Sequence, residues 1–477
     1  MKHLALLALF AATPALAAPA ADIVTKRIDA DAQRNAKDAD AIWSFAEVGY
    51  KETRSSALLQ ARMKDAGFRV EPGVAGIPTA FTATYGSSGP VIAILGEFDA
   101  LPGLSQEAVP EHKSAAGRDA GHGCGHNLFG VASASAAIAV ADWLKASGRP
   151  GTVRFYGTPA EEGGAGKVYM VRAGLFKDVD VALHWHPGDS NSADIATSNA
   201  NKSAKFRFHG VSAHAAGAPE KGRSALDGVE VMDVMTNFMR EHMPQDARMH
   251  YVITAGGRAP NVVPDFAEVF YYVRHADPRV VEQLFDRVVK AAQGAAMGTG
   301  TTVDYEVIHG ALSLLPNRTL QTLMHQKLTE VGGIRYSPAD LAFAQKIYPT
   351  LVQPRGRIGD QEKIDPMSED HGAGSTDVGD VSWTVPTAGI RVATFVPGTS
   401  NHSWQAVAAG GTDIGHKGVQ VAAKTIALTA VELFEKPQLI AEAKTEWLER
   451  RGKDFVYRPL LGDRAPALNY RDAPTAE

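Results

Sequence analysis

A chain of 477 residues is longer than one ordinary hydrophobic core can serve, so two domains are expected. Hydrophobic residues make up 45% and charged residues 21% of the chain, which is ordinary for a globular protein. The formal net charge of -5 excludes the basic surface that nucleic acid or an anionic membrane would require, so neither is expected as a partner.

The N-terminus has the pattern of a secretory signal peptide. Lys2 precedes an apolar run at residues 4–12, and Pro14 leads into the small-residue pattern ALA at 15–17. We therefore predict a signal peptide at residues 1–17 and a mature protein that is periplasmic or secreted. A frayed hydrophobic N-terminal helix is the alternative interpretation.

Strand-like and helix-like patterns alternate over the first part of the chain. Residues 91–95 and 152–156 are apolar runs typical of buried strands, and residues 179–183 form a third. An alanine-rich stretch at 131–145, between the first two runs, predicts a helix. Strand, helix and strand at this spacing predict a mostly parallel α/β sheet.

From about residue 201 the pattern changes to alternating apolar and polar residues, as in half-exposed antiparallel strands. The expected strands lie at 205–209, 250–254, 268–274 and 302–308, and the expected helices at 224–241 and 278–297. Two helices on a four-stranded antiparallel sheet predict a compact α+β domain.

The α/β pattern returns from about residue 311, with a strand near 389–395 and a helix near 418–434. The simplest architecture is therefore an α/β domain interrupted by an inserted α+β domain. The predicted ranges are 22–200 and 310–445 for the first domain, 201–309 for the insert, and 446–477 for a charged C-terminal tail without a clear signal.

Polar residues collect where the predicted strands end or the helix begins, which is where open α/β sheets build their sites. These segments are GEFDALP at 96–102, GHGCGHN at 121–127, PAEEGG at 159–164 and HWHP at 184–187. Taken singly, such glycines, glutamates and histidines are usually ordinary loop residues. Their combination at neighbouring strand ends favours a shared site.

The residue types in these segments suit a metal centre. Cys124 and His126 are separated by one residue in a glycine-bounded turn, and Glu161 and Glu162 are adjacent. Thiolate, imidazole and carboxylate together suit zinc or a similar transition metal. One glutamate could coordinate metal while the other acts as general base on a metal-bound water. A metal would also account for a lone thiol in an oxidising compartment.

Longer motifs extend this pattern over most of the chain. They are GEFDALPG, GHGCGHN, PAEEGG, LHWHPG, GVSAHAAGAPEKGRSALDGV and GSTDVGDVS. These motifs resemble the metallopeptidase family of carboxypeptidase G, aminoacylase and the indole-acetyl-amino-acid hydrolases, and within it the aminobenzoyl-glutamate hydrolase branch. The resemblance implies an α/β, mostly parallel-sheet di-metal peptidase domain interrupted by a ferredoxin-like α+β dimerisation, or lid, domain.

The resemblance also implies roles for residues of the first motifs. Cys124 looks like the bridging ligand between two metals, a place that other branches fill with aspartate. His126 and Glu162 look like metal ligands, and Glu161 looks like the general base. Asp99 matches an aspartate that supports the ligands from behind.

The later motifs complete the implied ligand set. LHWHPG offers two histidines, of which the spacing in related branches selects His184, while His186 is expected to line the site. The last ligand is expected at His402. Glu97 stands where many relatives have a metal-binding histidine, so its role as a ligand is left open.

In the insert, His214 resembles the family's histidine that reaches the active site of the other protomer and polarises the scissile carbonyl, which implies a homodimer. Asn261 and Arg274 resemble positions that help bind the substrate's carboxylate or carbonyl. For Arg274, an ordinary surface charge is the alternative.

The resemblance implies hydrolysis of an amide bond in a small substrate with a free carboxylate, such as p-aminobenzoyl-glutamate or a related N-acyl amino acid. Two divalent metal ions per chain, Zn2+ or Mn2+, are the expected cofactors. The alternatives are an aminoacylase or dipeptidase of the same family, and a non-catalytic binding protein for carboxylated ligands. A pure binding protein would have no use for the general base Glu161.

Overall fold

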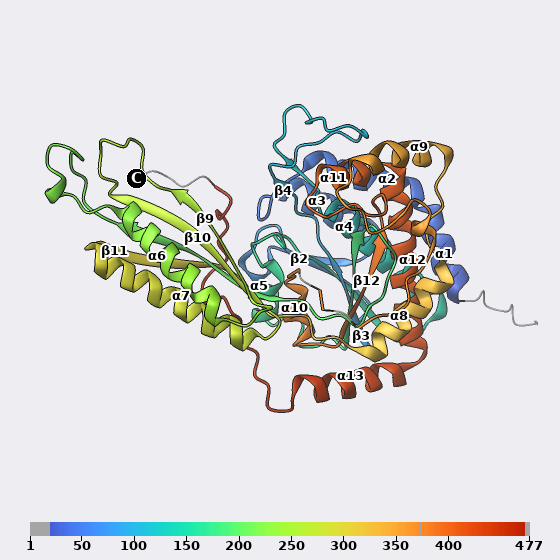
Figure 1. The fold of residues 1–477 in the computed structure, drawn as a ribbon. Coiled ribbons are helices and arrows are strands. Elements are labelled where there is room, and N and C mark those ends of the chain that lie inside the picture. Colours follow the sequence, from blue (N-terminus) through green and yellow to red (C-terminus); the bar gives the residue numbers. More distant parts are fainter. Residues whose placement is uncertain (1–19, 370, 373, 473–477) are drawn as a thin grey trace, which may run out of the picture.

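Two β-sheets, each with its own helices, divide the chain into a larger and a smaller lobe (Figure 1). The computed structural model describes residues 20–369, 371–372 and 374–472, so the predicted signal peptide lies outside the described residues. The smaller lobe comes from the middle of the sequence, from β8 (Ala200–His209) to β11 (Thr302–Ala311), and the larger lobe is formed by the segments on either side.

The larger lobe is built on a six-stranded sheet in the order β1-β2-β6-β3-β7-β12. Its strands are β1 (Arg69–Pro72), β2 (Phe81–Tyr85), β3 (Val91–Gly96), β6 (Thr152–Gly157), β7 (Val181–Gly188) and β12 (Thr387–Ala393). The last four are parallel to one another, whereas β1 and β2 add an antiparallel edge. Because β6 and β7 lie on opposite sides of β3, the direction of the chain crossovers reverses at β3, which is where such sheets form ligand sites.

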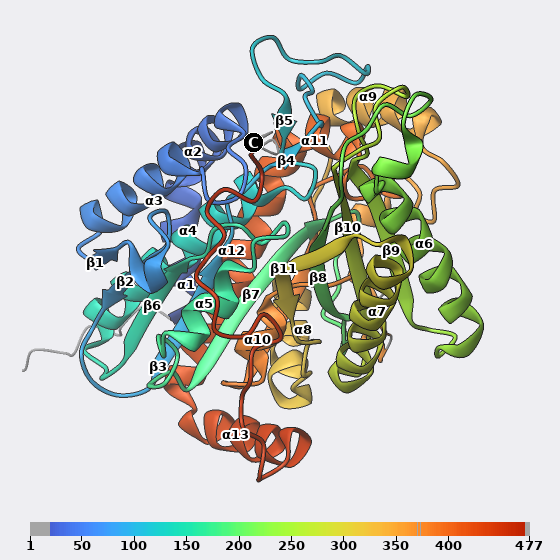
Figure 2. The same cartoon turned by 90° about the vertical axis from the view of Figure 1, so that its left-hand side faces the viewer.

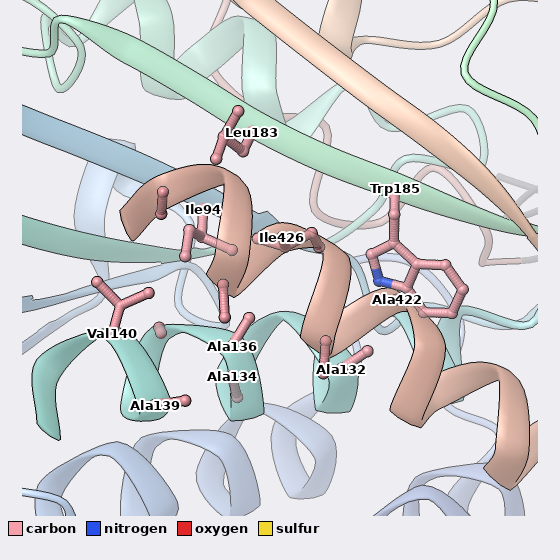
Figure 3. Packing of buried hydrophobic residues seen from close by; sticks show 14 of the residues in the cluster. Ile94, Ala132, Ala134, Ala136, Ala139, Val140, Leu183, Trp185, Ala422 and Ile426 are labelled. Atoms are coloured by element: carbon pink, nitrogen blue, oxygen red, sulfur yellow. The ribbon is translucent and has the colours of Figure 1, made fainter. Parts of the chain in front are cut away.

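Helices cover both faces of this sheet, which is why its central strands are apolar on both sides. α4 (His126–Ser147) and α12 (Asp413–Glu435) pack side by side against β3 and β7 (Figure 3). Small side chains such as Ala132 and Ala136 on α4 leave room for Ala422 and Ile426 of α12. Among the described residues, α4 is the one helix long and apolar enough to cross a membrane, and it is buried in this core.

The other elements of the larger lobe are shorter or more peripheral. They are α1 (Ala20–Ala30), α2 (Ala32–Phe45), α3 (Thr53–Asp65), α5 (Gly166–Arg172), α8 (Arg318–Val331), α9 (Pro338–Ile347), α10 (Val378–Ser382), α11 (Trp404–Gly410) and α13 (Pro437–Arg451), with β4 (Leu101–Pro102) paired to β5 (Ala120–Gly121). α5 and α10 contribute to a separate apolar cluster on the opposite side of the sheet from α4 and α12.

The smaller lobe is a four-stranded antiparallel sheet in the order β11-β8-β10-β9, with β9 (Arg248–Ala255) at one edge and β10 (Phe266–His275) beside it. α6 (Ala225–Met239) and α7 (Pro278–Thr299) pack against the sheet through their own apolar core, which includes Phe206 and Phe285. This lobe therefore has a core separate from that of the larger lobe.

The principal strands and helices expected from the sequence are present, with two differences that matter for function. β7 continues to Gly188 instead of ending near residue 183, so the HWHP segment belongs to the strand itself. α13 covers the start of the stretch expected as a featureless tail, and the chain beyond it packs against both lobes. Those contacts join segments far apart in sequence, which no local pattern predicts.

The packing of α4 against α12 in the larger lobe can be tested by substitution. Trp143 on α4 is 2% exposed, and its ring stacks on Phe434 of α12 with centroids 6.1 Å apart. We expect Trp143→Ala to lower the free energy of unfolding by about 3–5 kcal/mol, because it leaves a cavity between the two helices. Urea unfolding followed by circular dichroism measures this.

Met297→Ala is the matched control, because the Met297 side chain is 84% exposed on α7. It should change the free energy of unfolding by no more than about 0.5 kcal/mol. Equal losses in the two variants would contradict the packing described for α4 and α12.

Candidate metal centre and active site

A cavity of about 860 Å³ lies between the two lobes. The larger lobe lines it with side chains from the ends of β3, β6 and β7 and from the start of α4. The smaller lobe contributes residues of β8, β9, β10 and β11. Polar and ionisable side chains that line the cavity include Glu97, Cys124, Glu161, Glu162, His184, His186, Asn201, His250, Tyr272, Arg274, His309, Arg391, His402 and Arg471.

Two groups of metal-ligating side chains share Cys124. One group combines Cys124 with Glu162 and His402, and the other combines it with His126 and His186. Within each group the potential ligand atoms lie within 4.8 Å of one another. The Cys124 Sγ lies 3.0 Å from Nε2 of His402, and that nitrogen lies 3.3 Å from Oε1 of Glu162. A side chain common to both groups is placed to bridge two ions.

Hydrogen bonds behind the ligands orient the histidines toward this centre. Nδ1 of His126 lies 3.0 Å from Oδ1 of Asp99, which leaves Nε2 directed toward Glu97 and the other potential ligands. The other oxygen of Asp99 accepts a hydrogen bond of 2.9 Å from the Glu162 amide, so one carboxylate positions two potential ligands. Nδ1 of His186 lies 2.6 Å from the Pro187 carbonyl oxygen. Such partners fix the tautomer of a metal-binding histidine.

The structure brings His186, and not His184, to the other potential ligands. Side chains two apart on a strand share a face, so both histidines point from β7 toward the cavity. His186 lies two residues nearer the carboxyl end of the strand, and its ring nitrogen groups with the potential ligand atoms of Cys124 and His126. His184 packs against β12, where a Cβ added to Gly389 would come within 2.2 Å of its Nε2. The structure therefore groups His186 with Cys124 and His126, whereas the choice of His184 as the metal ligand stays a prediction from motif spacing.

Glu97 belongs to a third potential ligand group, with His126 and Glu161. Its Oε2 lies 3.0 Å from Nε2 of His126, and its Oε1 lies 2.7 Å from the ammonium of the fully buried Lys167. The same ammonium lies 2.7 Å from Asp377. Burial acts to lower the pKa of Lys167, but Asp377 and Glu97 raise it above its ordinary value, so the ammonium stays charged.

Lys167 and Asp377 are two site residues that the sequence did not predict. GSTDVGDVS was recognised as a motif, and the structure shows that its Asp377 holds Lys167 beside Glu97. Lys167 follows the PAEEGG segment by only three residues, but a lysine near the start of a helix is usually exposed. No local signal marks it as buried.

The backbone around Glu161 and His402 adopts unusual conformations. Ala160, immediately before Glu161, has a φ of 58°, and His402 has a φ of 59°. Left-handed conformations of residues other than glycine cost free energy and persist where the surroundings enforce them. The buried Glu52 carboxylate accepts a hydrogen bond of 2.8 Å from the Ala160 amide and so holds this turn in place.

The donor set fits divalent transition metals. Nε2 of His126, Oε2 of Glu97 and Oε1 of Glu162 are buried and lie within ion-pair distance of neighbouring ligand atoms, but none of them makes a hydrogen bond of normal geometry among the described residues. Buried polar atoms normally have partners, so their convergence around one thiol is the arrangement expected for cation ligands. Burial and the carboxylates of Glu162 and Glu161 raise the pKa of Cys124 well above its usual range, which a divalent cation would reverse.

Of the three candidate residues from the insert, the structure brings one to the cavity. Arg274 lines it from β10. His214 and Asn261 lie in neighbouring loops of the smaller lobe, where the Ala215 amide donates to the Asn261 carbonyl at 3.0 Å. Both side chains are exposed, and neither lines the cavity of this chain.

Comparisons with known proteins agree with this geometry. The model of the peptidase family M20/M25/M40 matches residues 93–427. One of the subunits of p-aminobenzoyl-glutamate hydrolase from Escherichia coli (strain K12) is 44% identical over 447 residues, covering 88% of this chain and 93% of that protein. The Xaa-Arg dipeptidase of Mus musculus is 30% identical and covers 88% of this chain and 90% of that protein.

A solved structure shows the same fold. It is a dinuclear metal binding peptidase of the M20 family from Bacillus subtilis, which matches with a TM-score of 0.53 at 16% sequence identity. The match covers 84% of this chain and 98% of that chain.

Metal analysis tests the two ligand groups. In protein reconstituted with zinc and dialysed, we expect two ions per chain, one ion after His186→Ala and none after Cys124→Ala. Inductively coupled plasma mass spectrometry measures the content, and circular dichroism verifies folding.

His184→Ala is the matched control, because His184 shares the strand face of His186 but belongs to neither group. It should retain both ions. Loss of metal from His184→Ala together with full retention in His186→Ala would reverse the assignment of the two histidines.

Proposed function

Because the chain belongs to the peptidase family M20/M25/M40, we propose that it is a two-metal amidohydrolase that cuts the amide bond of a small, carboxylate-bearing substrate such as p-aminobenzoyl-glutamate. The observation that carries this proposal is the pair of ligand groups sharing Cys124, with Glu161 beside them. The name of the relative that is 44% identical supports the choice of substrate.

Cys124, Glu162 and His402 would hold one divalent ion, and Cys124, His126 and His186 the other. When bound, such ions acidify water and polarise a carbonyl. A mixed sulfur, nitrogen and oxygen set suits Zn2+, and Mn2+ is the second candidate.

Glu161 is placed to move the proton. Burial, followed by the carboxylates of Glu97 and Glu162, raises the pKa of Glu161 well above its usual range, and nearby cations would lower it again. A carboxylate poised in this way accepts a proton from the attacking water and donates it to the leaving amine. Arg274, across the cavity, would bind the carboxylate of the substrate through its guanidinium fork.

The main rival is a different substrate within the same chemistry. An aminoacylase or a dipeptidase would use the same centre, and the relative named Xaa-Arg dipeptidase supports that alternative. Parallel assays of p-aminobenzoyl-glutamate, N-acyl amino acids and dipeptides distinguish these activities. A non-catalytic binding protein is disfavoured, because it would not need a general base such as Glu161 beside the ligands.

We also propose that the smaller lobe is a lid through which two chains form a homodimer. Exposed apolar side chains occur on α6 and on β9, the edge strand of the sheet in the smaller lobe. Figure 2 shows where these two elements lie in that lobe. They are Val231, Val234, Met235 and Phe238 on α6, and Tyr251, Val252 and Ile253 on β9. Unpaired edge strands beside an apolar helix face are suited to association. His214, exposed in the same lobe, would then act in the partner's cavity. Export through the segment at residues 1–17 completes the proposal.

The general base is tested by Glu161→Gln. The amide cannot take up the proton, so kcat for p-aminobenzoyl-glutamate should fall by roughly 10²–10⁴-fold. Metal content should stay at the wild-type level, because Glu161 belongs to neither Cys124 group. Near-normal turnover with full metal content would remove Glu161 from the mechanism.

The dimer is tested by complementation between two inactive variants. His214→Ala and Glu161→Gln chains carrying different affinity tags are co-expressed, and the mixed dimer is purified through both tags. One of its two cavities then combines an intact Glu161 with an intact His214 from the other chain, so about half of the wild-type activity should return.

The two homodimeric variants, purified in the same way, provide the inactive references. A mixed dimer as inactive as either of them would show that His214 does not act across the interface.

A further inference from the structure

The last described stretch of the chain, residues 452–472, runs from α13 back along the two lobes (Figures 1 and 2), and its residue Arg471 lines the cavity. It has no helix or strand, yet side-chain contacts fix it to both lobes. The Tyr457 hydroxyl donates to Asp380 of α10 at 2.6 Å, and the Arg464 guanidinium donates to the Val307 carbonyl of β11. Hydrogen bonds to both lobes therefore fix the position of this C-terminal tail, residues 452–472.

The end of the tail lies against the metal-ligating loop. The Tyr470 hydroxyl donates a hydrogen bond of 2.9 Å to the carbonyl oxygen of Glu162, and the Arg471 guanidinium donates to the same oxygen. The Tyr470 ring also packs edge-on against Tyr50, with centroids 5.7 Å apart. These contacts place Arg471 in the wall of the cavity.

A second guanidinium faces the same cavity from the smaller lobe. Arg274 lies over the ring of Tyr272, 5.3 Å from its centroid. A Cβ added to Gly163 would lie 3.4 Å from the Tyr272 hydroxyl and 3.9 Å from Nη2 of Arg471, so these two groups lie near one another. Tyr272 thus has both arginines in its neighbourhood.

Both arginines have unused hydrogen-bonding capacity. The Nε of each is buried and has no hydrogen-bond partner within the part of the chain that the structure describes. Guanidinium groups in such positions match carboxylates in geometry and charge. Two of them in one cavity suit a ligand with two carboxylates.

We propose that Arg471 determines specificity by binding the side-chain carboxylate of a dicarboxylic amino acid, while Arg274 binds the carboxylate that all substrates of the proposed function carry. This inference rests on that function. Arg274 lies inside the stretch matched by the family model, whereas Arg471 lies beyond its end at residue 427. A residue outside the shared part of the family suits a feature that only some substrates have.

Kinetics with paired substrates test the proposal. Arg471→Gln should raise KM for p-aminobenzoyl-glutamate by roughly 10–100-fold, because a charged hydrogen bond is lost, with kcat changed by less than about threefold. For p-aminobenzoyl-glutamine, which lacks the side-chain carboxylate, both constants should stay at the wild-type values. Arg471→Lys should restore part of the preference for glutamate, since it keeps the charge.

Asp472→Asn is the matched control, because Asp472 is the next residue of the tail and its side chain points to Lys51, 3.6 Å away. It should leave both substrates unaffected. A structural role of Arg471, limited to holding the Glu162 loop, would instead weaken both substrates equally or lower kcat for both. That result overturns the proposal, and so does an unchanged preference in Arg471→Gln.

A binding measurement tests the role of Arg471 independently of whether the protein hydrolyses p-aminobenzoyl-glutamate. Zinc-loaded Glu161→Gln protein is titrated with L-glutamate and L-glutamine by calorimetry, which requires no turnover. Tighter binding of glutamate that disappears on adding Arg471→Gln supports the tail site even if wild-type protein does not hydrolyse p-aminobenzoyl-glutamate. Equal affinities for the two amino acids before the substitution would overturn it.

Discussion

The structure depends on neutralising a buried cluster of acidic side chains. Glu97, Glu161 and Glu162 lie near the thiol of Cys124, and their burial, nearly complete for Glu97 and partial for the other two, makes negative charge costly there. Lys167 offsets one of these charges from within the larger lobe. The remaining negative charges require cations, and among the described residues Nε2 of His126, Oε2 of Glu97 and Oε1 of Glu162 converge there without a hydrogen bond of normal geometry.

The fold meets this constraint through the layout of its parallel sheet. β3, β6 and β7 end at the same edge, and α4 begins there with His126. The positive end of the α4 dipole therefore points toward the acidic cluster. Strained backbone at Ala160 and His402 completes the arrangement, and buried groups such as Glu52 hold that backbone in place. The loops that contain Ala160 and His402 therefore combine strained backbone with the side chains of the proposed site.

Much of the fold and part of the site could be predicted from the sequence, for identifiable reasons. Apolar runs and helical periodicity located the main strands and helices, because the buried face of each element requires apolar residues at regular spacing in the sequence. Cys124, His126 and the two adjacent glutamates stood out because thiols, imidazoles and paired carboxylates are rare beside glycine-bounded turns. The smaller lobe was recognisable from its alternating strands.

Other features depend on contacts between residues far apart in the sequence, which local sequence patterns do not indicate. The choice between His184 and His186 turned on where β7 ends, and strand ends are the least certain part of a pattern. Lys167 became recognisable only beside Glu97, its partner from another strand end. Arg471 lies near the end of a tail of irregular structure whose position is set by contacts with both lobes.

Anomalous X-ray diffraction at the zinc edge, from crystals of the zinc-loaded protein, would locate the bound ions and their ligands. We expect two zinc peaks per chain, with the Cys124 sulfur bonded to both and His186 bonded to one. A single peak, or two ions neither of which is bound by Cys124, would contradict the shared-thiolate centre on which the proposed chemistry rests.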